Sequence, residues 1–232
     1  MAAHTEARGP ADLKTSLQAL KSLRGPGRPR PARLAELKAW QAQRLAQTYA
    51  DLASQPRYEA ATRFFLEDLY GPKDFSARDE ELLKIVPVMQ KILPAKAVET
   101  AALAIELEAL SEALDHALAK ALASGPLDES SYAAAYRMSS TREERMRQID
   151  LVEAVGRRLD ALVKKPLIGG TLKLMRKPAH LAGLGDLQDF LEEGYRAFRT
   201  MNGCEEFLDA LHARETAILN RLFSGASKPF SP

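Results

Sequence analysis

The sequence predicts an all-α protein, an irregular bundle of about seven to nine helices. Helix-favouring Ala, Leu, Glu, Lys and Arg are abundant, whereas aromatic residues, which favour strands, make up only 6% of the chain. Apolar residues recur at spacings of three and four, which places them on one face of a helix. No stretch alternates apolar and polar residues as a half-buried strand would.

Residues 1–31 are expected to form a basic N-terminal arm. A short amphipathic helix over 11–24 precedes a Pro/Gly-rich linker that disfavours regular structure. Residues 1–33 hold seven basic and two acidic side chains, a net +5, so the rest of the chain carries −3 of the total +2. The arm could touch a polyanion. Nucleic acid is not an expected partner, because no interleaved aromatic residues or known binding motif accompany the charge.

A single helical domain is expected over 32–224, beginning with a helix from Ala32 to Ala53. The next helix, 60–70, bears a wide apolar stripe, and Gly71-Pro72 should end it. A helix over 77–93 follows, with a kink expected at Pro87.

Two stretches resemble a known family. They read Phe64-Phe65-Leu66-x-Asp68-Leu69-Tyr70-Gly71-Pro72-x-Asp74-Phe75-x-x-Arg78-Asp79 and Leu174-Met175-Arg176-x-Pro178-Ala179-x-Leu181-Ala182-Gly183-Leu184-Gly185. They are similar to a family of uncharacterised proteobacterial proteins, and the resemblance covers most of the chain from Pro31 onward. It implies a bacterial, intracellular, helical protein and supplies no catalytic residue.

Four more long helices should complete the bundle, over 96–123, 141–164, 186–201 and 204–223. Their apolar residues repeat with the three-four rhythm of helices that pack against one another. Ser140 or Thr141 should cap one of them, and a short helix with Tyr132 and Tyr136 precedes it. Residues 225–232 are expected to be a loose C-terminal tail.

The segment 164–185 predicts a less regular connector, because it holds four glycines and two prolines. It also carries five basic side chains and no acidic one. One alternative is an anion held near Gly169-Gly170-Thr171 by backbone N–H groups at a helix start. Its apolar residues also allow an amphipathic ligand, such as a fatty acyl anion, or contact with a membrane surface.

Gly156 and Gly194 occupy positions in the apolar stripes of their helices, where glycine weakens a helix by about 1 kcal/mol. Close helix crossing is the favoured explanation, and space for a ligand between the two helices is the alternative. The residues that would bind such a ligand are Gly156, Gly194, Lys173, Arg176, His180, Tyr195, Phe198, His212 and Glu215.

Glu215 stands where the stripe of the last helix calls for an apolar residue. A carboxylate there must find a partner or shift its pKa upward. His212, one turn earlier, is the first candidate partner, with Arg196 and Arg199 as competitors. A structural ion pair is favoured over a catalytic acid.

No metal site, cofactor or catalytic group is expected. Glu108, Glu112, Asp115 and His116 resemble a metal-binding set, but the leucine pattern of their helix places them on the opposite, solvated face. Cys204 opens a helix and has no cysteine partner, so we expect an inert core thiol.

The expected location is cytoplasmic. The N-terminus lacks the apolar core of a signal peptide, and no apolar run of about 18 residues is present. We expect a non-enzymatic binding or regulatory protein with a protein partner, including a homodimer through a leftover apolar helix face. The alternative is a carrier or sensor for an apolar anionic small molecule held between helices 141–164 and 186–201. A third hypothesis is an enzyme that uses Glu215 and His212.

Overall fold

The computed structural model describes residues 13–24, 29–66 and 95–231, and within them it contains helices and no strand. The all-α prediction is confirmed. Ten helices lie in this part of the chain, slightly more than expected: α1 Leu13–Arg24, α2 Leu34–Thr48, α3 Ala50–Ala53, α4 Pro56–Phe64, α6 Ala95–Ala121, α7 Glu129–Ser139, α8 Arg142–Val163, α9 Pro166–Leu181, α10 Gly185–Met201 and α11 Glu205–Ser224.

Part of the sequence prediction lies outside the described residues. This holds for the helix over 77–93, for its kink at Pro87 and for the Gly71-Pro72 stop before it.

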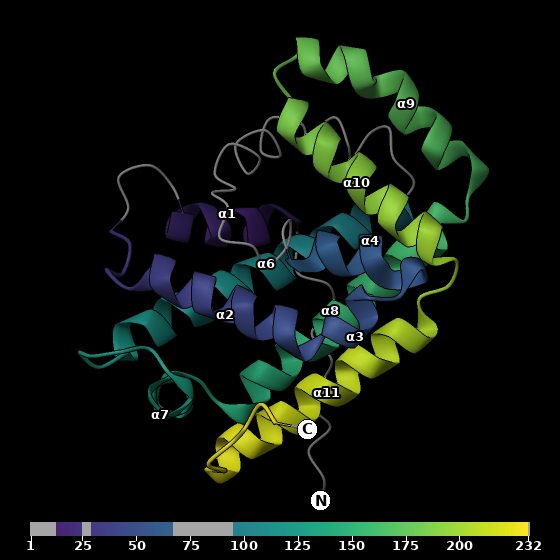
Figure 1. The fold of residues 1–232 in the computed structure, drawn as a ribbon. Helices are drawn as coiled ribbons and strands as arrows, with labels where there is room; N and C mark the ends of the chain where they lie inside the picture. The colour runs from purple at the N-terminus through teal and green to yellow at the C-terminus, as the bar shows by residue number, and fades with distance from the viewer. Residues whose placement is uncertain (1–12, 25–28, 67–94, 232) are drawn as a thin grey trace, which may run out of the picture.

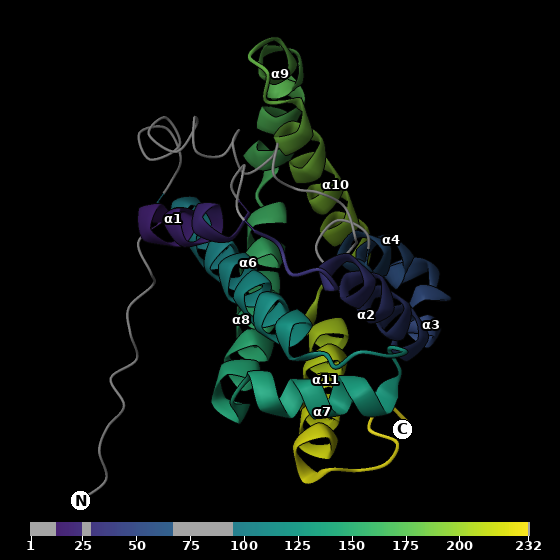
Figure 2. The ribbon, with the colours of Figure 1, turned by 90° about the vertical axis from the view of Figure 1, so that its left-hand side faces the viewer.

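Helix α6 runs through the middle of the molecule, with α1, α2, α7 and α8 packed around it (Figures 1 and 2). Side chains on several sides of α6 are buried, among them Ile105, Leu107 and Leu114. Helix α6 is therefore buried on more sides than the leucine stripe in its sequence indicates.

An aromatic cluster joins α4 to the C-terminal helices. The ring of Phe65 lies 6.3 Å from that of Phe198 and 5.7 Å from that of Phe207, measured between centroids. Phe198 is almost fully buried in this core, together with Met201 and Leu208. The cluster fixes α10 and α11 against the segment that begins the first family-like motif.

The C-terminal residues are not a loose tail, contrary to the sequence prediction. The ring of Phe230 lies 5.6 Å from Trp40 and 5.8 Å from Tyr132. Arg221 also donates a hydrogen bond of 2.7 Å to the carbonyl oxygen of Pro229. The aromatic residue near the end of the chain thus completes a second core cluster.

The helix of the N-terminal arm packs onto the bundle. Leu17 and Leu20 of α1 are buried, and Leu17 joins Ala102, Ile105 and Leu187 in a small apolar cluster. At the end of α1, Arg24 reaches two carboxylates of α6.

Local signals set several helix ends, and the expected cap at Thr141 is confirmed. Thr141 caps α8 in a reciprocal arrangement with Glu144, which satisfies two backbone N–H groups. Asn202, at φ 51°, and Gly225, at φ 77°, take the left-handed conformation that ends α10 and α11.

The segment expected to be an irregular connector is instead the helix α9, so that prediction is wrong. Its glycines and Pro178 weaken the helix, and contacts with α10 offset this weakness. The α9–α10 pair lies at one end of the described structure, and α7 and the C-terminal end of α11 lie at the other (Figures 1 and 2).

Candidate functional site

The turn between α9 and α10 is a complete helix-stop motif. Gly183 has φ 71°, the N–H of Leu184 donates to the carbonyl of Ala179 at 2.9 Å, and the N–H of Gly183 donates to that of His180 at 3.1 Å. This is the hydrogen-bond pattern of a Schellman motif. It reverses the chain and lays α10 against α9.

Polar contacts hold the inner side of α9 to α10. Arg176 Nε lies 2.9 Å from Glu192 Oε1, and His180 Nε2 lies 3.3 Å from Asp189 Oδ1. Gln188 donates a hydrogen bond of 2.8 Å to the carbonyl oxygen of Leu172. The hydrogen bonds from Arg176, with a smaller one from Gln188, outweigh desolvation and lower the pKa of Glu192 to about 2.

Glycines bring the two helices close together. A Cβ atom at Gly169 would lie 2.4 Å from the hydroxyl oxygen of Tyr195, and one at Gly185 would lie 2.8 Å from Nδ1 of His180. Gly169, Gly170 and Thr171 lie inside α9, not ahead of its start. Tyr195 and His180, two of the predicted ligand-binding residues, therefore pack between α9 and α10.

The outer side of α9 is apolar and exposed. Leu167, Leu174 and Leu181 are 81%, 78% and 90% exposed. Of the six large apolar side chains that are exposed in the described structure, five lie on α9 and α10. We call Leu167, Leu174 and Leu181, with Lys173 and Lys177 beside them, the outer face of α9.

The basic residues of the outer face differ from those of the inner side. Lys173 and Lys177 are exposed, and within the described structure no hydrogen bond or ion pair engages their ammonium groups, whereas Arg176 and His180 pair with acids of α10. Helix α9 contains no acidic residue. Its unpaired charge is therefore positive and lies beside the leucines.

Side chains fill the space beside the two stripe glycines. A Cβ atom at Gly156 would lie 2.7 Å from Leu208 Cδ2, and one at Gly194 would lie 2.9 Å from Phe64 Cζ. Both glycines thus serve close packing, which the sequence favoured. A shallow apolar pocket of about 30 Å³ lies elsewhere, and its volume suits a water molecule rather than an acyl chain. Its lining residues are Leu45, Tyr49, Thr62, Phe65, Leu66, Phe207 and Leu211.

Glu215 finds partners on α2 and at its C-cap that the sequence did not indicate. Its Oε1 accepts hydrogen bonds from Arg44 Nη1 at 2.6 Å and from the Tyr49 hydroxyl at 2.8 Å. His212 turns to α8, where its Nε2 lies 3.0 Å from Asp150 Oδ1. No hydrogen bond or ion pair joins Glu215 to His212, so the acid-base pair of the enzyme hypothesis is not formed.

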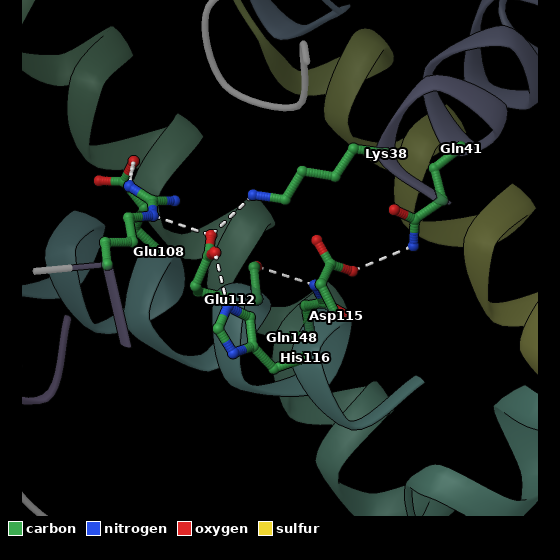
Figure 3. Close-up of polar contacts among 9 residues, drawn as sticks. Lys38, Gln41, Glu108, Glu112, Asp115, His116 and Gln148 are labelled. Carbon is green, nitrogen blue, oxygen red and sulfur yellow. Dashed lines mark hydrogen bonds and ion pairs between the residues drawn. The ribbon is translucent and has the colours of Figure 1, made fainter. Parts of the chain in front are cut away.

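The acidic set on α6 is a buried network, not a solvated face, so that prediction is wrong (Figure 3). Glu112 is 3% exposed and His116 7%. Glu112 Oε2 lies 2.8 Å from both Arg24 Nε and Lys38 Nζ. Helices α1 and α2 pack on this side of α6, and the leucine pattern of α6 alone could not show them.

The remaining contacts close this network. His116 Nε2 lies 3.2 Å from Glu112 Oε1, in ion-pair range but without hydrogen-bond geometry. Gln41 donates to Asp115 Oδ1 at 3.1 Å. Burial opposes the ionisation of Glu112, but Arg24 and Lys38 outweigh it and lower its pKa. For Asp115 burial prevails over the hydrogen bond from Gln41 and raises the pKa.

One group within the described residues brings potential metal ligands together. Asp160, Cys204 and Glu205 have ligand atoms within 4.8 Å of one another. Lys164 Nζ lies 2.5 Å from Asp160 Oδ2 and already supplies a positive charge there. Burial raises the pKa of the Cys204 thiol to about 11, as suits a core thiol that stays protonated.

The sequence analysis did not predict the outer face of α9, because the glycines and prolines of this segment have low helix propensity and argued against a helix. The signal that could have found it is the spacing of Leu167, Leu174 and Leu181 at intervals of seven, which keeps them on one side of a helix. Among the described helices, none combines the length and apolar character that a membrane crossing needs.

A family model described as Domain of unknown function (DUF8198) matches residues 23–229. The chain belongs to this family. The DUF8198 region includes α2 to α11, and so the α9–α10 pair and the whole buried network, whereas α1 lies before it except for its last two residues. No curated protein and no solved structure matches the chain. The expectation of an uncharacterised helical family is confirmed at this level.

Proposed function

We propose that this DUF8198 protein is a non-enzymatic binding module that docks through the outer face of α9 onto an apolar surface with negative charge. The observation that supports this is the alignment of Leu167, Leu174 and Leu181, each at least 78% exposed, on one helix. A single exposed leucine is ordinary, but a row of them with polar residues beside it is typical of an interaction site.

The interior acids favour binding over catalysis. Glu112 is engaged by Arg24 and Lys38, and Glu215 by Arg44 and Tyr49. A general acid or base needs a group that is free to exchange a proton with a substrate. These two carboxylates instead join α1, α2 and α11 to the bundle.

The positive charge of the outer face favours a negatively charged partner over a second copy of the chain. Two copies meeting through this face would bring Lys173 and Lys177 of each copy together without an acid from α9. Like charges in contact oppose association. An occupant with negative charge next to an apolar surface fits better than a second copy.

Photo-crosslinking in cells tests this proposal. A benzophenone amino acid replaces Leu174 in one variant and Met138 in another, since Met138 is also 78% exposed but lies on α7. We expect crosslinked products from position 174 and none from position 138. Equal yields at both positions, or no product at 174, would contradict a docking role for α9. A product joining two copies of the chain would contradict the assigned charge preference.

A further inference from the structure

We infer that the surface met by the outer face of α9 is the interface of an anionic lipid bilayer. This inference rests on the proposed function and names the occupant of the same face. It would make the protein a peripheral membrane-binding protein, with α9 lying in the plane of the headgroups.

The positions of the leucines suit a flat apolar boundary. Seven residues advance an α-helix by about two turns, less about 20°, so Leu167, Leu174 and Leu181 stay within about 40° of one another. Ile168 and Leu172 are half-buried and Ala179 is buried, so these three residues mark the covered side of the helix. The three leucines therefore form a line along the helix, turned away from its covered side.

Lys173 and Lys177 lie to one side of the leucine row, at the level that lipid headgroup phosphates would take. At about 100° per residue, Lys177 lies about 60° and Lys173 about 100° from the direction of Leu174. Lysine stems reach along apolar surface and place the ammonium group at the polar boundary. Leucines that enter the acyl boundary would thus bring both ammonium groups level with the phosphates.

The partition of charge within the hairpin supports an anionic surface. Asp189 and Glu192 of α10 pair with His180 and Arg176 on the inner side. The ammonium groups of Lys173 and Lys177 are left without an acid of this chain within the described residues. An interfacial helix that binds anionic lipid has this combination of a leucine row and unpaired lysines.

Shape favours a bilayer over a protein groove. Helix α9 lies at one end of the described structure in both views, with α10 between it and α4 (Figures 1 and 2). A helix held in a groove is normally contacted on several sides, whereas α10 covers only the inner side of α9, and the most exposed apolar side chains, Leu167, Leu174 and Leu181, follow a single row. A planar surface can meet that row along its whole length.

Vesicle co-sedimentation of the full chain tests the inference. One set of vesicles contains phosphatidylcholine alone, and the other an equal mixture of phosphatidylcholine and phosphatidylglycerol. We expect binding to the mixed vesicles that weakens with added salt, and little binding to the neutral ones.

Variants locate the contact. Replacing Leu167, Leu174 and Leu181 by serine should weaken binding to the mixed vesicles at least about a hundredfold. The double change Lys173→Gln with Lys177→Gln should weaken it about twenty-fivefold, since each lysine near an anionic surface contributes about a factor of five. Matched controls are Met138→Ser for the leucines, and Lys120→Gln with Lys228→Gln for the lysines, all exposed elsewhere. If the triple variant fails to fold, Leu174→Ser alone should weaken binding about tenfold.

The outcomes separate this inference from the proposed function. Absence of vesicle binding, equal binding to neutral vesicles, or equal loss in the control variants would overturn the lipid assignment. A protein crosslinked from position 174, together with no vesicle binding, would overturn the lipid assignment and leave the binding module standing. Neither vesicle binding nor a crosslink from position 174 would overturn both.

Discussion

Arg44 Nη1 lies 2.6 Å from Glu215 Oε1 and joins α2 to α11 across 171 positions of the sequence. Both side chains are mostly buried, and Tyr49 adds a hydrogen bond to the same oxygen. Burial would lower the pKa of Arg44, but Glu215 outweighs it and raises that pKa above its ordinary value. Glu215, which interrupts the apolar stripe of α11, thus links α11 to α2 through an ion pair.

Removing the charge of Glu215 should destabilise the protein, because Arg44 would keep its buried charge without a counter-ion. For Glu215→Gln we expect the free energy of unfolding to fall by about 3 kcal/mol in urea denaturation. The double change Arg44→Met with Glu215→Leu should recover most of this loss. Equal free energies of unfolding for wild type and Glu215→Gln would show that the ion pair of Arg44 and Glu215 does not stabilise the fold.

Two glycines should respond in opposite ways to alanine. Gly194→Ala would place a Cβ 2.9 Å from the ring of Phe64, so we expect a loss of about 1–3 kcal/mol. Gly170 has nothing within 4 Å of an added Cβ, so Gly170→Ala should stabilise α9 by up to about 1 kcal/mol. Thermal and urea unfolding measure both changes. If Gly194→Ala stabilised the protein, the space beside Gly194 would have to be empty rather than filled by Phe64.

Acid should weaken the buried network on α6. Arg24 and Lys38 hold the pKa of Glu112 below the ordinary 4.5 against the effect of burial. A folded-state pKa below the unfolded value means that the stabilisation is complete above pH 4.5 and is lost as the pH falls through the folded value. Arg24→Met removes one of the two cations, so its acid-induced loss should begin at a higher pH than in wild type.

The control for this prediction is Lys21→Met, an exposed residue on the same helix. Urea midpoints measured from neutral pH to about pH 3 compare the three proteins. Identical pH profiles for wild type and Arg24→Met would mean that Arg24 does not set the ionisation of Glu112.

The contact between Arg176 and Glu192 should make the α9–α10 pair sensitive to stronger acid. The pKa of Glu192 is lowered to about 2, so its contribution is full above pH 4.5 and declines as the pH falls toward 2. We expect NMR titration of the Glu192 carboxyl carbon to give this low value in wild type and an ordinary value in Arg176→Gln. An ordinary Glu192 pKa in both proteins would show that Arg176 and Glu192 do not form this ion pair in solution.

Features fixed by neighbours in sequence could be predicted. Thr141 with Glu144 three residues later marks a helix start, and Gly225 marks a helix end, because both act through backbone groups one turn away. The leucine rhythm likewise gave the long helices α6, α8, α10 and α11 close to their observed bounds.

Features fixed by distant segments could not. Glu112 appeared to face solvent because one helix pattern does not reveal that α1 and α2 cover its side of α6. Arg44 could not be matched to Glu215, since nothing local distinguishes it from the other arginines. Helix α9 was missed because the contacts from α10 that offset Gly169 and Pro178 are tertiary.

The most direct test of the central claim is the environment of a nitroxide spin label at position 174. Cys204 is 1% exposed, so a label should react at an introduced Leu174→Cys and, as control, Met138→Cys. With mixed phosphatidylcholine and phosphatidylglycerol vesicles, we expect the label at 174 to lose collisions with a water-soluble relaxant and gain collisions with oxygen, while the label at 138 stays in water. A label at 174 that remains as water-exposed as the one at 138 would contradict the account.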